Sequence, residues 1–424
     1  MRPGPRRLRG ADVTATRRGG AGSSTKRGRT TAAARSGRAA PPRRPEISVV
    51  RRGPDPSTMV VVTVALLCGL GVVMVYSASS VTAVRTLGHS WGIVMRQAVW
   101  LVLGVAAAYG ASRVPWRIWR DRVALPLMLV SVALLGYVAL GVLAQKATGS
   151  ALPFVISVNG ATRWVGAGSM QFQPSDLAKP ALILWLARLL SEKGRDVRTW
   201  EGLRPVLIWS GLTCGLVVFG DDLGTTMLLG AVTLAMVFMA GAPLPKLGAI
   251  AGVSIGLGGL AIVGLERFRV TRILAFLDPD KYRQGAGWQL WQSQIGLASG
   301  GVFGTGPGLA RSKWGFLPEA HTDFILAVIG EELGLVGSLI VLGLFVVFMA
   351  AGCAIGMRAR TGFTRLVAFG ITTWIGVQAL INIGVTVGTL PTKGITLPFV
   401  SYGGSSLLMS LVGVGILLSV AREA

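Results

Sequence analysis

The sequence predicts an all-α polytopic membrane protein with ten transmembrane helices and a long extracytoplasmic loop between helices 7 and 8. The 424 residues are 51% hydrophobic and only 14% charged, with a mean hydropathy of +0.60. This is more apolar than a soluble domain of the same size requires. Apolar runs close to the roughly 20 residues needed to cross a bilayer also recur along the chain. The predicted spans are about 59–79, 91–111, 123–143, 175–191, 203–219, 222–241, 245–265, 323–352, 363–389 and 396–421.

Residues 1–57 precede the first span as a basic tail. They contain 15 Lys or Arg and 3 Asp or Glu residues, so the tail contributes +12 to the formal net charge of +24. Because this composition offers few large apolar side chains to bury, we expect the tail to be disordered. No short apolar segment of the signal-peptide type follows its arginines. We interpret it as a cytoplasmic arm for anionic lipid or a protein partner rather than nucleic acid; a solvated tail without a ligand is the alternative.

The basic residues of the short loops predict the orientation in the cell membrane. With the tail in the cytoplasm, the basic clusters at 113–122, 188–204, Lys246 and 358–365 all lie on the cytoplasmic side. This arrangement satisfies the positive-inside bias. An even number of spans then returns the C-terminus to the cytoplasm. Residues 58–424 are therefore predicted to form one multi-pass transmembrane domain of the cytoplasmic membrane.

Three connections are predicted to lie outside the membrane, at 144–174, 266–322 and 390–396. The loop 266–322 is by far the longest, and loops of such length are usually functional or disordered. Its tryptophan and phenylalanine side chains indicate an ordered segment at the outer interface. Any chemistry is therefore expected on the extracytoplasmic side.

Cysteine and histidine usage limits the kind of site. The three cysteines, Cys68, Cys214 and Cys353, lie within apolar runs and have no spacing typical of a disulfide or a metal site. The chain has only two histidines, so a histidine-rich metal site is excluded. No cofactor is required by the sequence, and a divalent cation such as Mg²⁺ or Mn²⁺ would need oxygen ligands.

The strongest candidate site is the stretch LPEAHTDFILAVIGEELG, residues 317–334. It places Glu319, His321, Thr322 and Asp323 where the long outer loop meets the eighth span. In a purely structural interpretation, Thr322 caps the helix and Asp323 complements its dipole. In a functional one, Asp323 is a general base for a sugar hydroxyl or a ligand of a divalent cation beside phosphates. The sequence leaves these roles open.

Two adjacent acids follow on the same predicted helix. Glu331 and Glu332 lie eight and nine residues beyond Asp323, about 12–14 Å deeper at 1.5 Å per residue. Carboxylates at that depth are costly and need partners. We expect one to pair with a basic side chain while the other faces a cavity, with a function or helix packing as equal alternatives.

Other polar residues are candidates for binding a substrate. Lys179 lies within the fourth span, and Arg163 lies in the first outer loop, where a guanidinium suits phosphate contacts. Lys393 and Ser401 lie in the last outer turn, whose prolines break the helix, and a broken segment at membrane depth must line a cavity or be buried. Glu319, His321 and Thr322 belong to the same set.

Two amides, Gln378 and Asn382, stand at i, i+4 spacing in the ninth span. For this pair, interhelical hydrogen bonding is the simpler interpretation.

Three blocks, in order, resemble one family. NIGVTVGTLPTKGITLPFVSYGGSS (382–406), LPEAHTDFI with the following GEELG, and RWVGAG…FQPSDLAK (163–179) are similar to blocks of the SEDS family of shape, elongation, division and sporulation proteins. The wording PEAHTDF and TKGITLPF resembles the division branch more than the elongation branch. The resemblance covers about residues 59–421.

The resemblance implies a ten-helix fold and a function. It implies a peptidoglycan glycosyltransferase that polymerises lipid II into glycan strands at the division septum, with Asp323 as its catalytic residue. The implied partners are a class B penicillin-binding protein, which supplies the transpeptidase, and other divisome proteins. The alternatives are a lipid II flippase, an elongation-type polymerase, and a scaffold that only recruits the transpeptidase; the extracytoplasmic position of Asp323 favours an enzyme over a transporter.

Overall fold

The structure is a computed structural model that describes residues 55–149, 152–158, 161–167, 170–265, 267–278 and 280–423. The first 54 of the 57 residues of the predicted basic tail lie outside the described residues, so its disorder and its ligand stay predictions. The first described helix begins at Pro56, close to the predicted start of the transmembrane domain.

Most of the described chain is helical. The N-terminal half contains α1 (Pro56–Leu87), α2 (Gly92–Arg113), α3 (Trp116–Ile118), the π-helical turn η1 (Trp119–Val123), α4 (Ala124–Thr148), β1 (Val155–Val158), β2 (Ala161–Ala167), β3 (Met170–Phe172), α5 (Pro174–Lys193) and the 3₁₀ turn η2 (Gly194–Arg198). The remainder contains α6 (Trp200–Phe219), α7 (Leu223–Met239), α8 (Leu244–Leu265), α9 (Arg267–Leu277), α10 (Trp288–Gly300), the 3₁₀ turn η3 (Ser312–Trp314), α11 (Ile325–Arg358), α12 (Gly362–Val387) and α13 (Gly404–Ala421).

Seven helices of the described residues are long and apolar enough to cross a membrane: α1, α2, the continuous segment Trp116–Thr148, α6, α11, α12 and α13. The chain is therefore a multi-pass membrane protein. Helices also overlap the other three predicted spans. Two of these, α7 and the apolar part of α8, are shorter, and α5 contains several charged residues.

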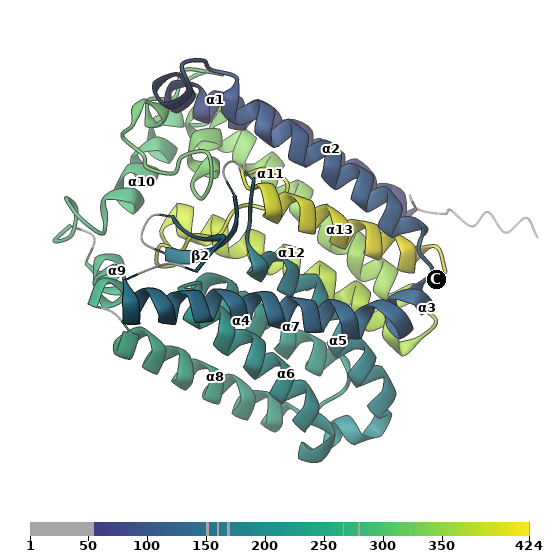
Figure 1. The fold of residues 1–424 in the computed structure, drawn as a ribbon. Helices are drawn as coiled ribbons and strands as arrows, with labels where there is room; N and C mark the ends of the chain where they lie inside the picture. Colours follow the sequence, from purple (N-terminus) through teal and green to yellow (C-terminus); the bar gives the residue numbers. More distant parts are fainter. Residues whose placement is uncertain are drawn as a thin grey trace, which may run out of the picture. The chain divides into compact units, whose positions relative to one another are not determined.

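Helix α5 is surrounded by other helices, which explains how a charged helix is accommodated. It packs against α4, α6, α7 and α12, and Leu182, Leu184 and Leu186 are fully buried. Helix α13 packs along α2, and α1 packs along α11. In Figure 1, α9 and α10 lie toward one end of these helices, and α3 and the C-terminus lie at the other. Exposed Val, Leu and Ile side chains on the outer helices suit contact with lipid acyl chains.

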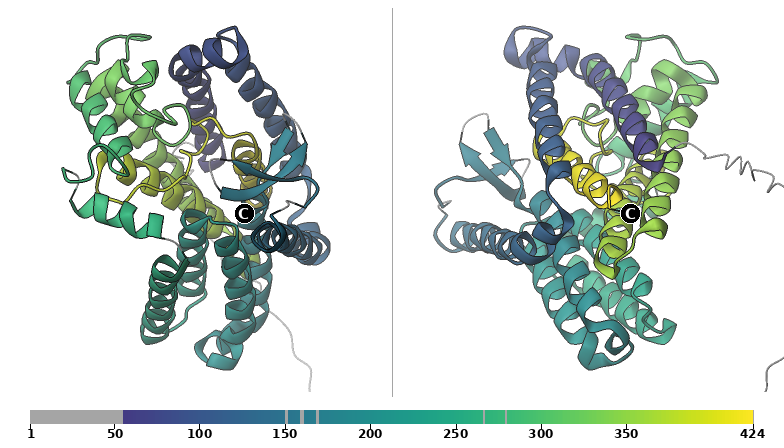
Figure 2. Two further views of the ribbon diagram at one scale, coloured as in Figure 1. Left: turned by 60° about the vertical axis from the view of Figure 1, so that its left-hand side comes forward. Right: turned by 90° about the vertical axis from the view of Figure 1, so that its right-hand side faces the viewer.

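The segment between α4 and α5 is a small antiparallel sheet in the order β1-β2-β3, seen beside the helices in Figure 2. Val155 pairs with Val165, and Val165 pairs with Phe172 on its other side. The sequence predicted only that this segment does not span the membrane. Strand β2 contacts α4 and α5, which anchors Arg163 over the helices.

Helix α11 is not the continuous span that the sequence predicted. It breaks at Gly334, whose backbone has φ 70 and ψ −164. The outer loop supplies the hydrogen bonds that the break removes: the N–H groups of Leu335 and Val336 donate to the carbonyls of residues 301 and 302, at 3.0 and 3.2 Å. In return, the N–H groups of residues 305 and 306 donate to the carbonyls of Glu331 and Glu332. A break at membrane depth is tolerated because protein satisfies its backbone groups.

The carboxylates of Glu331 and Glu332 bind the same outer loop. Glu331 accepts hydrogen bonds from the N–H of Arg311 at 2.6 Å and from the hydroxyl of Ser312 at 2.6 Å. Glu332 lies 3.8 Å from Lys313 Nζ, so the predicted pairing of one acid with a basic residue is confirmed. The expectation that the other acid faces a cavity is wrong, because the loop satisfies Glu331. Both acids therefore act as structural anchors.

Candidate active site

Asp323 lies two residues before α11 and is half-buried. Its position is fixed through the backbone, because Asn382 Nδ2 of α12 donates to the carbonyl of Asp323 at 2.7 Å and to that of Ile395 at 2.7 Å. Asn382 is 1% exposed. One amide thus joins the start of α11 to the last outer turn. Asn382 was predicted to hydrogen-bond between helices, and it does so from α12 to the residues just before α11 and to the last outer turn.

Arg163 of β2 lies beside the Asp323 carboxylate. A Cβ atom built on Gly394 would lie 3.4 Å from Asp323 Oδ2 and 3.5 Å from Arg163 Nη2. The Asp323 carboxylate and the Arg163 guanidinium therefore both border the space in front of Gly394. The structure brings together two candidates from different outer loops, and a glycine at 394 keeps the space between them open.

Burial and opposing charges set the ionisation of Asp323. Burial raises the pKa of Asp323 to about 7, and the neighbouring Glu319 and Asp222 carboxylates also raise it, whereas Arg163 and Arg272 lower it. A carboxyl group in such surroundings changes its charge near neutral pH. This is the range in which a carboxylate is an effective general base.

Arg272 of α9 is a site residue that sequence reasoning missed. Its charge acts on Asp323, and burial lowers the pKa of Arg272, an effect that the Asp323 carboxylate opposes. In the sequence, Arg272 is only one of several basic residues of the long loop. The alternation of apolar and basic residues in RFRVTRILAFL indicates an amphipathic helix, but nothing in it selects the arginine whose charge acts on Asp323.

Glu319 shapes the turn before Asp323. Its φ of 55 lies in the left-handed region, which is rare for a residue with a side chain. In this conformation the Glu319 carbonyl accepts hydrogen bonds from the N–H groups of Thr322 and Phe324, at 3.2 and 3.4 Å. The Thr322 hydroxyl donates to Glu319 Oε2 at 2.8 Å. The alternative in which Thr322 caps α11 is therefore wrong, since Phe324 occupies the N-cap position.

His321 contacts the segment before α13 through both its backbone and its ring. Burial lowers the pKa of His321, and the Glu319 carboxylate only partly opposes this effect. Its carbonyl accepts a hydrogen bond from the N–H of Tyr402 at 2.9 Å, and the two rings lie 5.6 Å apart. His321 therefore joins the turn before α11 to the segment before α13.

Lys179 lies in the interior of the helices. It is 4% exposed, and its Nζ lies 2.7 Å from Asp176 Oδ1 and 3.5 Å from Gln378 Oε1. Ser405 donates to the other Asp176 oxygen at 2.6 Å. This network joins α5, α12 and α13, and no contact joins it to Asp323 among the described residues. Substrate binding by Lys179 stays a prediction.

Replacing Asp176 by Asn should destabilise the protein by about 3–5 kcal/mol, because it leaves the Lys179 ammonium buried without a countercharge. The double variant Asp176→Asn/Lys179→Met should recover most of the loss in the thermal unfolding of the purified protein. A double variant as unstable as the single one would contradict the pairing. If Lys179 also binds substrate, the double variant will recover stability without recovering activity.

The last outer turn supplies Lys393 and Ser401. The Ser401 hydroxyl is buried and accepts a hydrogen bond from the N–H of Leu397 at 2.9 Å. It stabilises the turn before α13. Lys393 is half-buried and lies beside the start of α7, since its Cβ is 3.7 Å from a Cβ built on Gly224. Neither substrate-binding prediction is tested by these contacts.

A small cavity adjoins the site beneath β2. Arg163, Ser175 and Asp222 line it together with aliphatic side chains of α4 and α6. Asp222 Oδ2 accepts hydrogen bonds from Gln173 Nε2 at 2.8 Å and Ser175 Oγ at 2.9 Å. Arg163 Nε is buried and has no hydrogen-bond partner within the part of the chain that the structure describes. This nitrogen is therefore a donor that the described protein groups leave unsatisfied.

The donor set does not fit a divalent cation held by the protein alone. The described residues include no group of three or more His, Cys, Asp or Glu side chains that could hold a metal ion. Two arginines act on Asp323, and they compete with a cation for the same negative charge. Magnesium is nevertheless often held by one or two carboxylates and substrate phosphates, so a cation at Asp323 would depend on the substrate for most of its ligands.

Replacing Asn382 by Leu should reduce catalysis more than it reduces stability. The change leaves two carbonyls without their donor, at about 1–3 kcal/mol each, and releases the backbone of Asp323. The control is Gln378→Leu, one helical turn away, which removes a donor to the last outer turn at the Thr396 carbonyl and also the acceptor of Lys179 and Trp374. It should therefore cost at least as much stability without acting on Asp323. Equal losses of catalytic rate, measured alongside thermal unfolding, would contradict a special role for Asn382.

The family follows from a comparison with known proteins. The model of the FtsW/RodA/SpoVE family, described as "Cell cycle protein", matches residues 57–424. The chain belongs to this family. The SEDS resemblance predicted from the three sequence blocks is thereby confirmed, and the family match covers the whole transmembrane domain.

Relatives and solved structures agree with this assignment. A Geobacter metallireducens protein named "Probable peptidoglycan glycosyltransferase FtsW" is 39% identical, over 86% of this chain and 94% of its own length. A Thioalkalivibrio sulfidiphilus protein of the same name is 41% identical over 85% and 88%. A chain from a structure described as "Structural coordination of polymerization and crosslinking by a peptidoglycan synthase complex" superposes with a TM-score of 0.67 at 30% identity, covering 86% of this chain and 96% of that one. The Thermus thermophilus rod shape determining protein RodA gives a TM-score of 0.62 at 28% identity, over 86% and 95%.

Proposed function

We propose that this chain is a peptidoglycan glycosyltransferase of the FtsW type, which polymerises lipid II into glycan strands for septal wall synthesis in cell division. The observation that supports this most is the position of Asp323. Its carboxyl group has a pKa near 7 and lies next to Arg163 at the entrance to α11. A carboxylate base next to a guanidinium group that can bind phosphate suits glycosyl transfer from a diphosphate donor.

In the proposed reaction, Asp323 is the general base. It takes the proton from the 4-hydroxyl of an incoming lipid II sugar as that oxygen attacks the anomeric carbon of the growing chain. The bond from oxygen to the anomeric carbon forms while the bond to the diphosphate breaks. Undecaprenyl diphosphate then leaves with the electron pair, and the configuration at the anomeric carbon inverts.

Arg163 and Arg272 would neutralise the diphosphate. They come from β2 and α9, so they approach Asp323 from two separate outer segments. Arg163 Nε is buried without a hydrogen-bond partner among the described residues, and a phosphate oxygen would satisfy it. Guanidinium groups bind phosphates through two hydrogen bonds at once. These charges would stabilise the leaving group as its negative charge increases.

The proposed reaction passes through no metal ion. Arg163 and Arg272 provide the positive charge that a divalent cation would otherwise supply. Lys393 and Glu319, which lie around the same site, are proposed to contact the sugar or phosphate groups, and His321 and Thr322 to keep the turn in place.

We propose ten transmembrane helices, namely the seven long spans together with α5, α7 and α8. Both termini would face the cytoplasm, because the basic residues of the short loops gather at the end away from Asp323. The site would then face outward, at the depth of the lipid headgroups. In the cell, the protein would act at the division septum.

The proposed partner is a class B penicillin-binding protein that crosslinks the new strands, together with other divisome proteins. The similarity to a chain of a peptidoglycan synthase complex that couples polymerization and crosslinking supports such a partner. The high identity to several proteins named FtsW supports the division branch over the elongation branch.

The deciding experiment is polymerisation of lipid II by the purified chain, with and without its transpeptidase partner, followed by separation of the glycan strands on a gel. Strands that appear with the chain and are absent without it support the proposal. Lipid II translocation in liposomes, with no strand formation under any condition, would instead support a flippase.

A further inference from the structure

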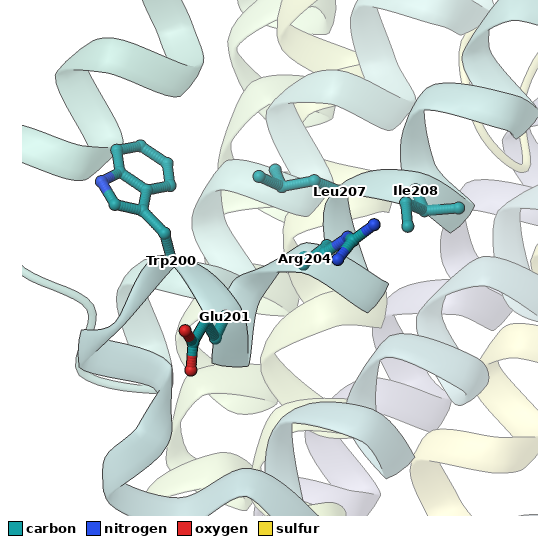
Figure 3. Close-up of a pocket in the computed structure, with 5 residues that line it drawn as sticks. All are labelled: Trp200, Glu201, Arg204, Leu207 and Ile208. Atoms are coloured by element: carbon teal, nitrogen blue, oxygen red, sulfur yellow. The ribbon is translucent and has the colours of Figure 1, made fainter.

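An open hollow lies on α6, far along the fold from Asp323. Trp200, Glu201, Arg204, Leu207 and Ile208 line it (Figure 3), and it encloses about 750 Å³ including space open to the outside. The 20-residue helix α5 separates the two places, because Ser175 at its start binds Asp222 near the catalytic site, whereas η2 and α6 follow its end. The hollow is therefore a separate feature of the fold.

The side chains that line the hollow change from aromatic and charged to aliphatic along α6. Trp200 is 51% and Ile208 is 55% exposed, and eight residues of helix place them about 12 Å apart along its axis. Arg204 lies between them and is exposed. The hollow thus runs from an aromatic ring past a cation to aliphatic side chains. Tryptophan is typical of the membrane interface, and Leu and Ile are typical of the hydrocarbon region.

The positive charge of the hollow is not neutralised locally. Arg204 makes no hydrogen bond or ion pair within the described ranges of the chain, and in Figure 3 its guanidinium and the Glu201 carboxylate point away from each other. Lys246 of α8 adds a second cation, since its Nζ lies 5.1 Å from the centre of the Trp200 ring and donates to the carbonyl of Arg198. The hollow therefore contains one cation and one acid, Arg204 and Glu201, and a second cation lies next to its Trp200 end.

We infer that this hollow binds an anionic phospholipid of the adjacent leaflet. The lipid phosphate would contact Arg204 and Lys246, the Trp200 ring would lie at the level of the glycerol, and one acyl chain would lie along Leu207 and Ile208. A soluble anion would leave these aliphatic side chains unused. A zwitterionic lipid would add a positive headgroup next to two cations. The chemistry of the lining therefore selects a lipid with net negative charge.

Native mass spectrometry of the full chain, released from phosphatidylglycerol or phosphatidylcholine vesicles, tests this inference. The wild type should retain phosphatidylglycerol in preference to phosphatidylcholine. Arg204→Gln should reduce this preference about fivefold, the factor that corresponds to one basic residue near a membrane surface. The matched control is Arg358→Gln at the end of α11, an exposed arginine outside the hollow. It removes one basic residue without the neighbouring Trp200 and Ile208 side chains, so it should reduce the preference clearly less than Arg204→Gln does.

Three results would overturn the inference. The first is equal loss of phosphatidylglycerol in Arg204→Gln and Arg358→Gln, and the second is equal retention of both lipids by the wild type. The third is complete displacement by millimolar glycerol 3-phosphate, which would identify a site for a soluble anion. Because Arg204 lies away from Asp323, both variants should still polymerise lipid II, so the lipid site and the proposed activity can fail independently.

Discussion

Replacing Asp323 by Asn is expected to reduce lipid II polymerisation by about 10²–10⁴-fold, because the amide cannot accept the proton of the attacking hydroxyl. The substitution keeps the size of the side chain, and the backbone hydrogen bond to Asn382 does not involve the carboxylate. Folding and binding to the transpeptidase partner should therefore be retained. Strand synthesis is measured on gels, and partner binding by co-purification.

The matched variant for this experiment is Glu319→Gln. Glu319 raises the pKa of Asp323, so removing its charge should lower that pKa but keep the base itself. Because Glu319 is also proposed to contact the substrate, the two variants are compared at saturating lipid II, where a weakened substrate contact does not limit the rate. If Asp323→Asn polymerises lipid II at the same rate as Glu319→Gln, the assignment of the base is wrong. If both variants bind the partner normally, a loss of activity cannot be attributed to misfolding.

The same carboxyl group predicts the pH dependence. A general base acts in its ionised form, and the pKa of Asp323 is raised to about 7 by burial. The rate should therefore fall as the pH decreases through 7, well above the range in which an ordinary aspartate titrates. In Glu319→Gln the decrease should begin at lower pH. A rate that is independent of pH between 5 and 8 would contradict this ionisation.

Replacing Gly304 by Ala is expected to have the largest effect on folding. Gly304 has φ 84, and a Cβ atom there would lie 2.1 Å from the carbonyl oxygen of Glu332. The Cβ is fixed to the loop backbone and the oxygen belongs to the helix backbone, so no flexible side chain can move aside to relieve the clash. The loop would separate from the break in α11 and leave the carbonyls of Glu331 and Glu332 without donors. The purified variant should unfold at a clearly lower temperature and lose activity.

Two neighbouring glycines separate the causes of this effect. Gly301 also has a positive φ, 55, but a Cβ there would meet no atom within 4 Å, so Gly301→Ala tests backbone strain alone, at about 1–3 kcal/mol. A Cβ on Gly300 would lie 1.9 Å from the Gly330 carbonyl without a left-handed φ, so Gly300→Ala tests the clash alone. Equal unfolding temperatures for Gly301→Ala and Gly304→Ala would show that contact between loop and helix contributes little.

The sequence was informative wherever the signal is local. The long apolar runs predicted ten ranges that all overlap helices of the structure, and the polar cluster at the start of the eighth span identified Asp323 as a candidate. Arg163 was a weak candidate in the sequence, yet it lies beside Asp323, because the sheet that carries it folds back over the helices. The three sequence blocks were sufficient to recognise the family.

The features that sequence reasoning missed depend on contacts between distant segments. The charge of Arg272 acts on Asp323 from α9, and no local pattern encodes this long-range effect. Glycine is common in transmembrane helices, so Gly334 gave no sign of a break. The structural alternative in which Thr322 caps α11 was wrong, because the Thr322 hydroxyl donates to Glu319, whose backbone is left-handed. Glu331 and Glu332 suggested a buried polar site but not the loop that they bind.

The break in α11 also determines how this part of the domain can enter the membrane. Without the loop, the backbone N–H and C=O groups on either side of Gly334 would have no hydrogen-bond partner, and such groups are unstable among acyl chains. The segment that closes it, residues 301–306, precedes it by only about thirty residues, and contacts of such short separation form early. That segment also leaves the ribosome first. We therefore expect α11 to be inserted together with the loop, as one unit of membrane-protein biogenesis.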